Sequence, residues 1–241
     1  MKYRNIVFDL YGTLIDIRTD EEDPAFWDKT AAFYISKGAP YNGRELRETY
    51  LSLVREEKEY AADPLYPEVD LRKVFSNLYR KKNTCAGEEL LNETAGFFRI
   101  ASLIRLGLYP GVRELLDFLH GQGCRLFLLS NAQRCFTMRE LEICGIKEDF
   151  EKIYLSSDHL CCKPSPRFFG ILFRENGIRR EETLMIGNDW LADMQGAYDA
   201  GFSGIYIHQA ISPPVTGRLR ALFAVSDGNV FRILDYLCKN G

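Results

Sequence analysis

Residues 5–13 read NIVFDLYGT, a short apolar run that stops at a carboxylate. A buried parallel strand has this composition, and its carboxyl end is where polar chemistry is usually found. We therefore predict a strand over Asn5–Phe8 with Asp9 at its carboxyl end. An Asp shortly before a Gly is also common in ordinary turns, so this stretch alone does not separate a catalyst from a turn.

Similar apolar runs follow Asp9 along the chain, and helical patterns separate most of them. Such alternation predicts an α/β fold, a Rossmann-like, doubly wound parallel sheet with helices on both faces. Ligands bind such sheets outside the carboxyl ends of the strands. The predicted strands are Arg125–Leu129, Lys152–Leu155, Thr183–Ile186, Gly204–His208 and, as a sixth, Ala221–Val225; the predicted helices are Val112–Gln122, Met138–Cys144, Pro166–Asn176 and Leu191–Ala200.

The stretch between the first and second predicted strands has a different pattern. It shows no clear buried strand but several long, charged amphipathic segments, which predict a helical insertion. The segments are 24–37, 43–60, 70–82 and 87–105. We predict that residues 17–108 form a helical cap domain, and that residues 1–16 and 109–241 form the catalytic core. Tyr109-Pro110-Gly111 marks the return to the core.

Composition and charge exclude several classes of protein. The chain has 241 residues, 46% of them hydrophobic and 27% charged, which is the balance of a globular protein. Its net charge of −3 gives no basic field for binding nucleic acid or an anionic membrane. No apolar run reaches the length of a membrane span, and the N-terminus lacks the features of a signal peptide. The seven cysteines show no zinc-site spacing, so we expect free thiols and a cytoplasmic location.

Three further clusters of polar residues follow predicted strands. Ser130-Asn131 ends the second run, Lys163 lies in the loop beyond the third, and Asp189 and Asp193 follow the fourth. Each has an ordinary explanation, as a helix N-cap or a solvated side chain. Because their strands end at one edge of a single sheet, their combination is far more specific than any one cluster.

The order of these clusters resembles the haloacid dehalogenase-like hydrolase superfamily. The resemblance rests on the run Asp9–Thr13, the helical insertion after the first strand, Ser130, Lys163-Pro164 and the stretch GNDWLADMQGAYDAG at residues 187–201. It implies that Asp9 is a covalent nucleophile and a Mg²⁺ ligand, and that the main-chain carbonyl of Tyr11 is a second ligand. It also implies that Ser130 holds a phosphate oxygen, and that Lys163 steadies Asp9.

The late acidic residues leave two assignments open. The superfamily spaces these acids four or five residues apart. A spacing of four selects Asp189 and Asp193, whereas a spacing of five places Asn188 at the metal. We favour Asp189, because a carboxylate is the better ligand for Mg²⁺. Asp193 is then expected in the metal shell or just behind it.

Tyr11 departs from the pattern of the superfamily's phosphatases, which usually carry a second Asp at this position. A phenol with a pKa of about 10 can donate a proton, here to the leaving oxygen, but it is a poor base at neutral pH. The superfamily's 2-haloacid dehalogenases do have Tyr there, and Asn131 also matches them. They need no metal and use a cap arginine, for which Arg55 is a candidate. Asp189 argues against this alternative, since dehalogenases tend to have a neutral residue there.

The acidic pair therefore favours a magnesium-dependent phosphatase that acts on a small phosphate monoester. A 2-haloacid dehalogenase is the first alternative, and a protein that binds a phosphorylated ligand or a partner without catalysis is the second. The insertion is expected to contact the substrate, with Arg55, Tyr60, Tyr66 and the stretch 24–27 as candidates. The sequence leaves the substrate and the oligomeric state open.

Overall fold

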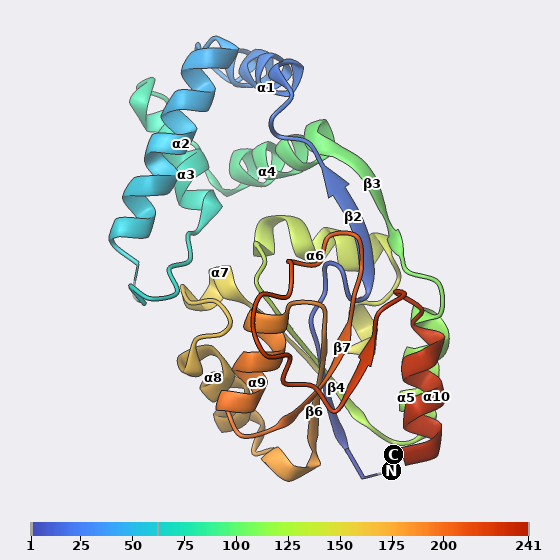
Figure 1. The fold of residues 1–241 in the computed structure, drawn as a ribbon. Helices are drawn as coiled ribbons and strands as arrows, with labels where there is room; N and C mark the ends of the chain where they lie inside the picture. Colours follow the sequence, from blue (N-terminus) through green and yellow to red (C-terminus); the bar gives the residue numbers. More distant parts are fainter. Residues whose placement is uncertain (1, 62, 241) are drawn as a thin grey trace.

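The computed structural model describes residues 2–61 and 63–240. In these residues six parallel strands form one sheet in the order β5-β4-β1-β6-β7-β8 (Figure 1). This confirms the predicted α/β class. The strands are β1 (Asn5–Phe8), β4 (Arg125–Ser130), β5 (Lys152–Leu155), β6 (Thr183–Gly187), β7 (Ser203–Ile207) and β8 (Phe223–Val225).

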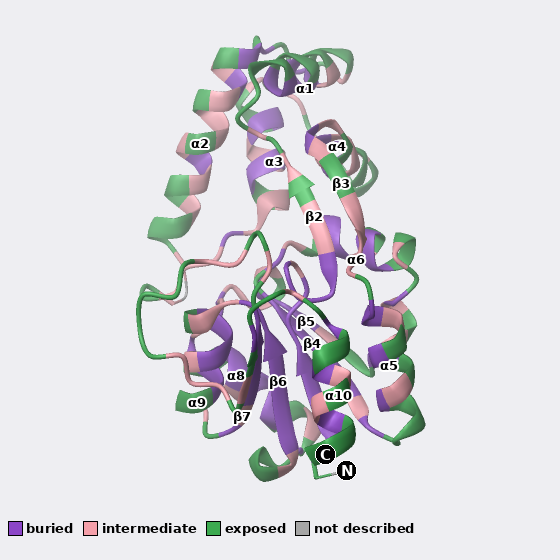
Figure 2. Cartoon of the chain, turned by 45° about the vertical axis from the view of Figure 1, so that its right-hand side comes forward, coloured by how far each residue is buried: buried purple, intermediate pink, exposed green. Residues whose placement is uncertain are grey.

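Both faces of the sheet are buried, because successive side chains of a strand point to opposite sides. In β1, Ile6 and Phe8 belong to one hydrophobic cluster and Val7 to another. Helices α5 (Val112–Gly121), α6 (Arg134–Ile143) and α10 (Phe231–Asn240) contribute to the first cluster. Helix α8 (Pro166–Asn176), the π-helix η3 (Trp190–Gln195) and α9 (Gly196–Asp199) contribute to the second. The central strands are buried along their length (Figure 2).

A layer of helices lies beyond the carboxyl ends of the strands, with its own apolar core (Figure 1). Asp23, Asn42 and Asp70 cap three of its helices through their side chains, which explains where these helices begin. The helices are α1 (Pro24–Ser36), α2 (Gly43–Glu59), α3 (Leu71–Lys81) and α4 (Glu88–Ser102). Phe136 of α6 is part of this same cluster, so α6 joins the layer to the sheet.

The stretch after β1 contains two strands that were not predicted, although neither is buried along its length. Strands β2 (Ile15–Thr19) and β3 (Leu103–Leu108) pair antiparallel and connect the sheet to the helical layer (Figure 1). The helix predicted over 87–105 therefore ends at Ser102. The apolar positions of β3 also fit a helix, and the strand forms because β2, far away in sequence, supplies its hydrogen bonds.

Other boundaries differ by a few residues, with larger differences at two helices. Helix α6 begins at Arg134, four residues before the predicted Met138, and α10 was not predicted. The short elements η1 (Lys147–Asp149), α7 (Ser156–His159) and η2 (Arg180–Glu182) were not predicted either. No helix in the described part of the chain is both long and apolar enough to cross a membrane.

The position of β1 determines where a site can form. Strand β1 lies between β4 and β6 in the sheet. The chain continues from β1 to β4 and β5 on one side, and then crosses to β6, β7 and β8 on the other side. The order of the strands reverses there, which opens a crevice outside their carboxyl ends. Asp9, Ser130 and Asn188 stand at the ends of these three strands and so meet at that crevice.

Candidate active site

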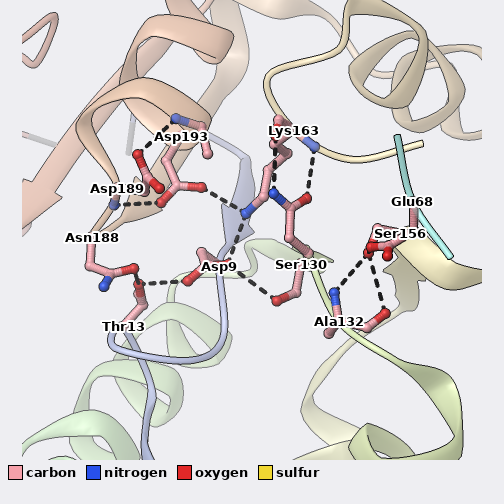
Figure 3. Close-up of polar contacts among 12 residues, drawn as sticks. Asp9, Thr13, Glu68, Ser130, Ala132, Ser156, Lys163, Asn188, Asp189 and Asp193 are labelled. Atoms are coloured by element: carbon pink, nitrogen blue, oxygen red, sulfur yellow. Dashed lines mark hydrogen bonds and ion pairs between the residues drawn. The ribbon is translucent and has the colours of Figure 1, made fainter. Parts of the chain in front are cut away.

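The residues predicted from the four clusters come together at the carboxyl edge of the sheet (Figure 3). A cavity of about 190 Å³ opens above them. Its lining includes all the site residues predicted for the core, which are Asp9, Tyr11, Ser130, Asn131, Lys163, Asn188, Asp189 and Asp193.

Asp9 is held by three donors. Its Oδ1 accepts hydrogen bonds from Lys163 Nζ at 2.8 Å and from Ser130 Oγ at 3.2 Å. Its Oδ2 accepts from Thr13 Oγ1 at 3.2 Å. Only 7% of Asp9 is exposed, and that part faces the cavity. The carboxylate is therefore fixed in direction and still open to a ligand, as an attacking group needs to be.

Gly12 keeps this loop close to Asn188. Its φ of +82° is one that L side chains rarely adopt, and a Cβ there would lie 2.2 Å from Asn188 Nδ2. Thr13, for which the sequence predicts no role, follows directly and turns its hydroxyl back to Asp9. The run Asp9–Thr13 thus contains both residues of this hydrogen bond.

Lys163 joins Asp9 to Asp193. Its Nζ lies 2.7 Å from Asp193 Oδ1, and both side chains are almost completely buried. Burial alone would lower the pKa of Lys163, but the two carboxylates outweigh it and the pKa ends above its usual value. Burial raises the pKa of Asp193 to about 7, with Asp9 adding to the rise and Lys163 opposing it. Lys163 is therefore a fixed positive charge beside Asp9.

Asn131 holds the loop that carries Lys163. Its Nδ2 donates to the Lys163 carbonyl oxygen at 3.0 Å, and its Oδ1 accepts from the Lys163 N–H at 2.7 Å. These two bonds hold the backbone that carries Lys163. The Asn131 amide is thereby used for positioning, although the residue also lines the cavity.

The neighbouring residues Asn188 and Asp189 point in different directions. Asp189 Oδ1 accepts from the N–H groups of Leu191 and Ala192, so it caps the π-helix. The Asn188 side chain instead turns toward Asp9. With its nitrogen facing inward, it donates to Asp9 Oδ2 and to the Tyr11 carbonyl oxygen, both at 3.2 Å.

The orientation of the Asn188 amide decides whether the residues around Asp9 fit a cation. With the Asn188 amide turned the other way, three oxygens of Asp9, Tyr11 and Asn188 face one another, and a hard cation would satisfy them. No three His, Cys, Asp or Glu side chains are grouped to hold a metal in the described residues. Mg²⁺ is commonly bound by one or two carboxylates together with substrate phosphate, and the donor set fits that mode.

The Tyr11 hydroxyl is bound by helix α6. Its hydroxyl donates to Glu140 Oε2 and lies 2.9 Å from Thr137 Oγ1, both on α6. Burial, with Glu140 adding to it, raises the pKa of Tyr11 well above its usual value. Glu140 also pairs with Arg99 of α4, N to O at 2.9 Å. The sequence carried no local signal for Thr137, Glu140 or Arg99, since these residues come from helices that lie far from Tyr11 along the chain.

The residues predicted to reach the site from the helical layer divide into two groups. Arg55 and Tyr60 are exposed at the end of α2, and they do not line either cavity near Asp9. Tyr66 does not line those cavities either. Trp27, from the stretch 24–27, lines a second cavity next to the first. The arginines of that second cavity are Arg47 and Arg99.

Comparisons with known proteins show the family to which the chain belongs. A sequence profile of the haloacid dehalogenase-like hydrolases matches residues 3–201. Pyrophosphatase PpaX of Halalkalibacterium halodurans is 26% identical over 211 residues, which cover 88% of this chain and 86% of that protein. Phosphoglycolate phosphatase of Nitrosococcus oceani is 39% identical over 99 residues, which cover 41% of this chain and 43% of that protein.

Solved structures share the fold over almost the whole chain. A 2-haloacid dehalogenase from Pseudomonas syringae pv. Tomato DC3000 has a TM-score of 0.68 at 19% identity, covering 99% of this chain and 100% of that one. A phosphatase from Thermococcus onnurineus has a TM-score of 0.61 at 18% identity, covering 97% of both chains. At these identities the likeness concerns the fold alone. The profile match spans most of the chain, and on that ground the chain belongs to the haloacid dehalogenase-like hydrolases.

Proposed function

We propose that this hydrolase is a magnesium-dependent phosphatase that transfers the phosphoryl group of a small monoester to Asp9. The observation that carries the proposal is the division of the Asp9 carboxylate between two environments. Oδ1 is held by Lys163 and Ser130. Oδ2 accepts from Thr13 and lies beside the Asn188 side chain, which also faces the Tyr11 carbonyl oxygen. One side suits a phosphate anion and the other a cation. The phosphatase names of the curated relatives support the same choice.

Three groups of the site would neutralise and orient the phosphate. Lys163 supplies a fixed charge and Ser130 a hydroxyl donor, and both already contact Asp9. A Mg²⁺ ion held by Asp9, the Tyr11 carbonyl and Asn188 would supply further positive charge to the phosphate oxygens. Asp193 keeps Lys163 in place from behind.

The chemistry runs in two steps. An Asp9 carboxylate oxygen attacks phosphorus, and the bond from phosphorus to the alcohol oxygen breaks, which gives an aspartyl-phosphate. The alcohol oxygen leaves with the bonding electrons and takes a proton from water. A water molecule then attacks phosphorus, the bond to Asp9 breaks, and phosphate and the free carboxylate are formed.

Tyr11 supplies neither step with a strong general acid or general base. The phenol is engaged by Glu140, and its raised pKa keeps it protonated. A missing general acid or base costs a factor of about 10² to 10⁴ in rate. We therefore expect slow turnover that favours esters with good leaving groups.

The helical layer would act as the cap of this site. Residues 17–108 would form the cap and the remainder the catalytic core, joined by the ribbon of β2 and β3. A cap that stands over the carboxyl edge of the sheet can exclude water and contact the leaving group.

One observation favours a second function, 2-haloacid dehalogenation. Tyr11 stands where phosphatases of this family usually carry Asp, and that reaction needs no acid at this position. In it Asp9 would displace halide from carbon and form an ester, which water then hydrolyses. The neutral Asn188 also lies beside Asp9 and Asp189 serves as a helix cap, so the carboxylate that argued against a dehalogenase does not face the nucleophile. The phosphatase names of the curated relatives give the phosphatase the stronger support.

A panel assay separates these functions. The protein is incubated with phosphate monoesters and with 2-haloacids, each with Mg²⁺ and with a chelator, beside the Asp9→Asn variant. We expect phosphate release that needs both Mg²⁺ and Asp9. Halide release that survives the chelator would assign the dehalogenase. No release from either panel would leave ligand binding without catalysis as the function.

A further inference from the structure

A second cavity of about 410 Å³ continues from the cavity at Asp9. Tyr11 and Asn131 line both cavities, so the two meet at these residues. The second cavity lies under the helical layer and has the size of a pocket for an organic ligand. A group esterified to a phosphate at Asp9 would extend into it.

The walls of this cavity are rich in aromatic rings. Trp27 comes from α1, Tyr50 from α2, Phe98 from α4 and Phe136 from α6. The Tyr50 ring stacks on Phe98 at 5.4 Å between centroids and lies 5.3 Å from the ring of Trp27. Most of these rings belong to the core of the helical layer, but Tyr50 is only partly buried and retains surface in the cavity.

The charges in the cavity compensate one another. Arg47 pairs with Glu22 at 2.6 Å. Arg99 pairs with Glu140 at 2.9 Å, lies 3.9 Å from Glu21, and covers the Phe136 ring. Each cation among the described lining residues thus already has a carboxylate partner. A second anionic group on the substrate would compete with these carboxylates for the two arginines, whereas an uncharged ring would not.

We propose that this aromatic cavity holds a planar, uncharged ring carried by the alcohol of the phosphate monoester. The inference rests on the proposed function and adds the class of substrate to it. Aromatic side chains bind flat rings through their faces without demanding a fixed hydrogen-bonding pattern. A nucleobase on a ribose and a simple aryl group on a methylene both satisfy this chemistry.

Two pairs of substrates test the ring while keeping the leaving alcohol similar. Uridine 5′-monophosphate is compared with ribose 5-phosphate, which lacks only the base. Benzyl phosphate is compared with cyclohexylmethyl phosphate, in which the ring is no longer planar. We expect kcat/KM to be roughly tenfold or more higher for the aromatic member of at least one pair, the scale of one stacking contact. The pair that responds tells whether the ring is a nucleobase or an aryl group.

Variants at Tyr50 assign the effect to the cavity. Tyr50→Leu removes the ring and keeps an apolar side chain, and Tyr50→Phe keeps the ring. We expect Tyr50→Leu to raise KM for the preferred aromatic ester by roughly tenfold and to leave KM for its partner within about twofold. Tyr50→Phe should retain the wild-type preference. Tyr60→Leu, at the exposed C-terminal end of α2, is the matched control and should change neither KM.

The outcomes separate this inference from the proposed function. Equal hydrolysis of both members of both pairs, by the wild-type protein, would overturn the inference and leave the phosphatase intact. A preference that persists in Tyr50→Leu would also overturn it. No phosphate release from any ester, with Mg²⁺ present, would instead count against the phosphatase.

Discussion

The Tyr11 phenol donates a hydrogen bond to the Glu140 carboxylate and so ties the nucleophile loop to helix α6. Glu140 pairs in turn with Arg99 of α4. This chain of contacts runs from the residue two positions beyond Asp9 to the helical layer. It explains how a tyrosine can occupy this position without serving the reaction, since its hydroxyl is already used.

Replacing Tyr11 by Phe separates a structural role of the phenol from a catalytic one. We expect Tyr11→Phe to lower kcat by far less than the factor of about 10² that a lost general acid costs. Glu140 would lose a buried donor, so the free energy of unfolding should fall by about 1–3 kcal/mol. Phosphate release and urea unfolding measure the two effects. Tyr60→Phe, at a site that is 87% exposed, should change neither. A loss of kcat near 10² with unchanged stability would assign a catalytic role to the phenol.

Replacing Tyr11 by Asp restores the residue that related phosphatases use. An Asp side chain is too short to reach Glu140 as the phenol does, so its carboxyl group would stay near the cavity that Tyr11 lines. We expect Tyr11→Asp to raise phosphatase turnover by up to roughly 10². Tyr11→Asn has the same shape without a titrating proton and should give no gain. Turnover that stays level or falls in Tyr11→Asp would refute this explanation of the slow step.

The metal assignment is decided by two neighbouring substitutions. Asn188→Asp adds a carboxylate beside Asp9 and the Tyr11 carbonyl, so the Mg²⁺ concentration for half-maximal activity should fall by roughly tenfold or more. Asp189→Asn keeps a good helix cap and removes only a charge, so that concentration should stay within about twofold. Titration of activity with Mg²⁺ measures both. The reverse pattern would make Asp189 the direct ligand, as the sequence alone favoured.

The sequence could place Asp9, Ser130, Lys163 and Asp193 because each follows an apolar run. Runs that form one parallel sheet bring their carboxyl ends to one edge, so proximity follows from topology. The directions of adjacent side chains do not follow in this way. Asn188 and Asp189 share a strand end, and only the local backbone decides that one faces Asp9 and the other caps a helix.

Contacts between distant segments were also beyond the sequence. The pairing of β2 with β3 and the bond from Tyr11 to Glu140 each join residues separated by whole helices. Composition favoured a helix for β3, and nothing in the sequence near Glu140 marked it as a partner of Tyr11. The helical layer as such was predictable, because capping residues and amphipathic patterns are local.

Glu68 makes the stability depend on pH in a defined direction. It accepts from Gln133 Nε2 at 3.2 Å and from the Ser156 hydroxyl, and it ties the loop before α3 to the core (Figure 3). Burial raises its pKa above the usual 4.5. Folding therefore favours its protonated form. The contribution of Glu68 to stability is complete below the unfolded pKa and is lost as the pH rises through the folded pKa.

Replacement of Glu68 by Gln removes this dependence. We expect the free energy of unfolding of Glu68→Gln, relative to the wild-type protein, to increase as the pH rises from about 4.5. Urea unfolding at a series of pH values measures the difference. Glu142→Gln is a control of opposite sign, since Lys147 and Arg139 hold the pKa of Glu142 below its usual value. A difference for Glu68→Gln that is flat or declines with pH would refute the assignment.

Turnover in water labelled with heavy oxygen tests most directly whether the protein acts as a phosphatase that depends on Asp9 or as a dehalogenase that forms an ester of Asp9. Mass spectrometry follows the label in the released phosphate and in the peptide that carries Asp9, with p-nitrophenyl phosphate or a 2-haloacid as substrate. With Mg²⁺ and the phosphate ester, we predict label in phosphate and none in Asp9, and a loss of release by roughly 10³ or more in Asp9→Asn. Label in the Asp9 carboxylate together with halide release, or phosphate release that persists in Asp9→Asn, would contradict the account.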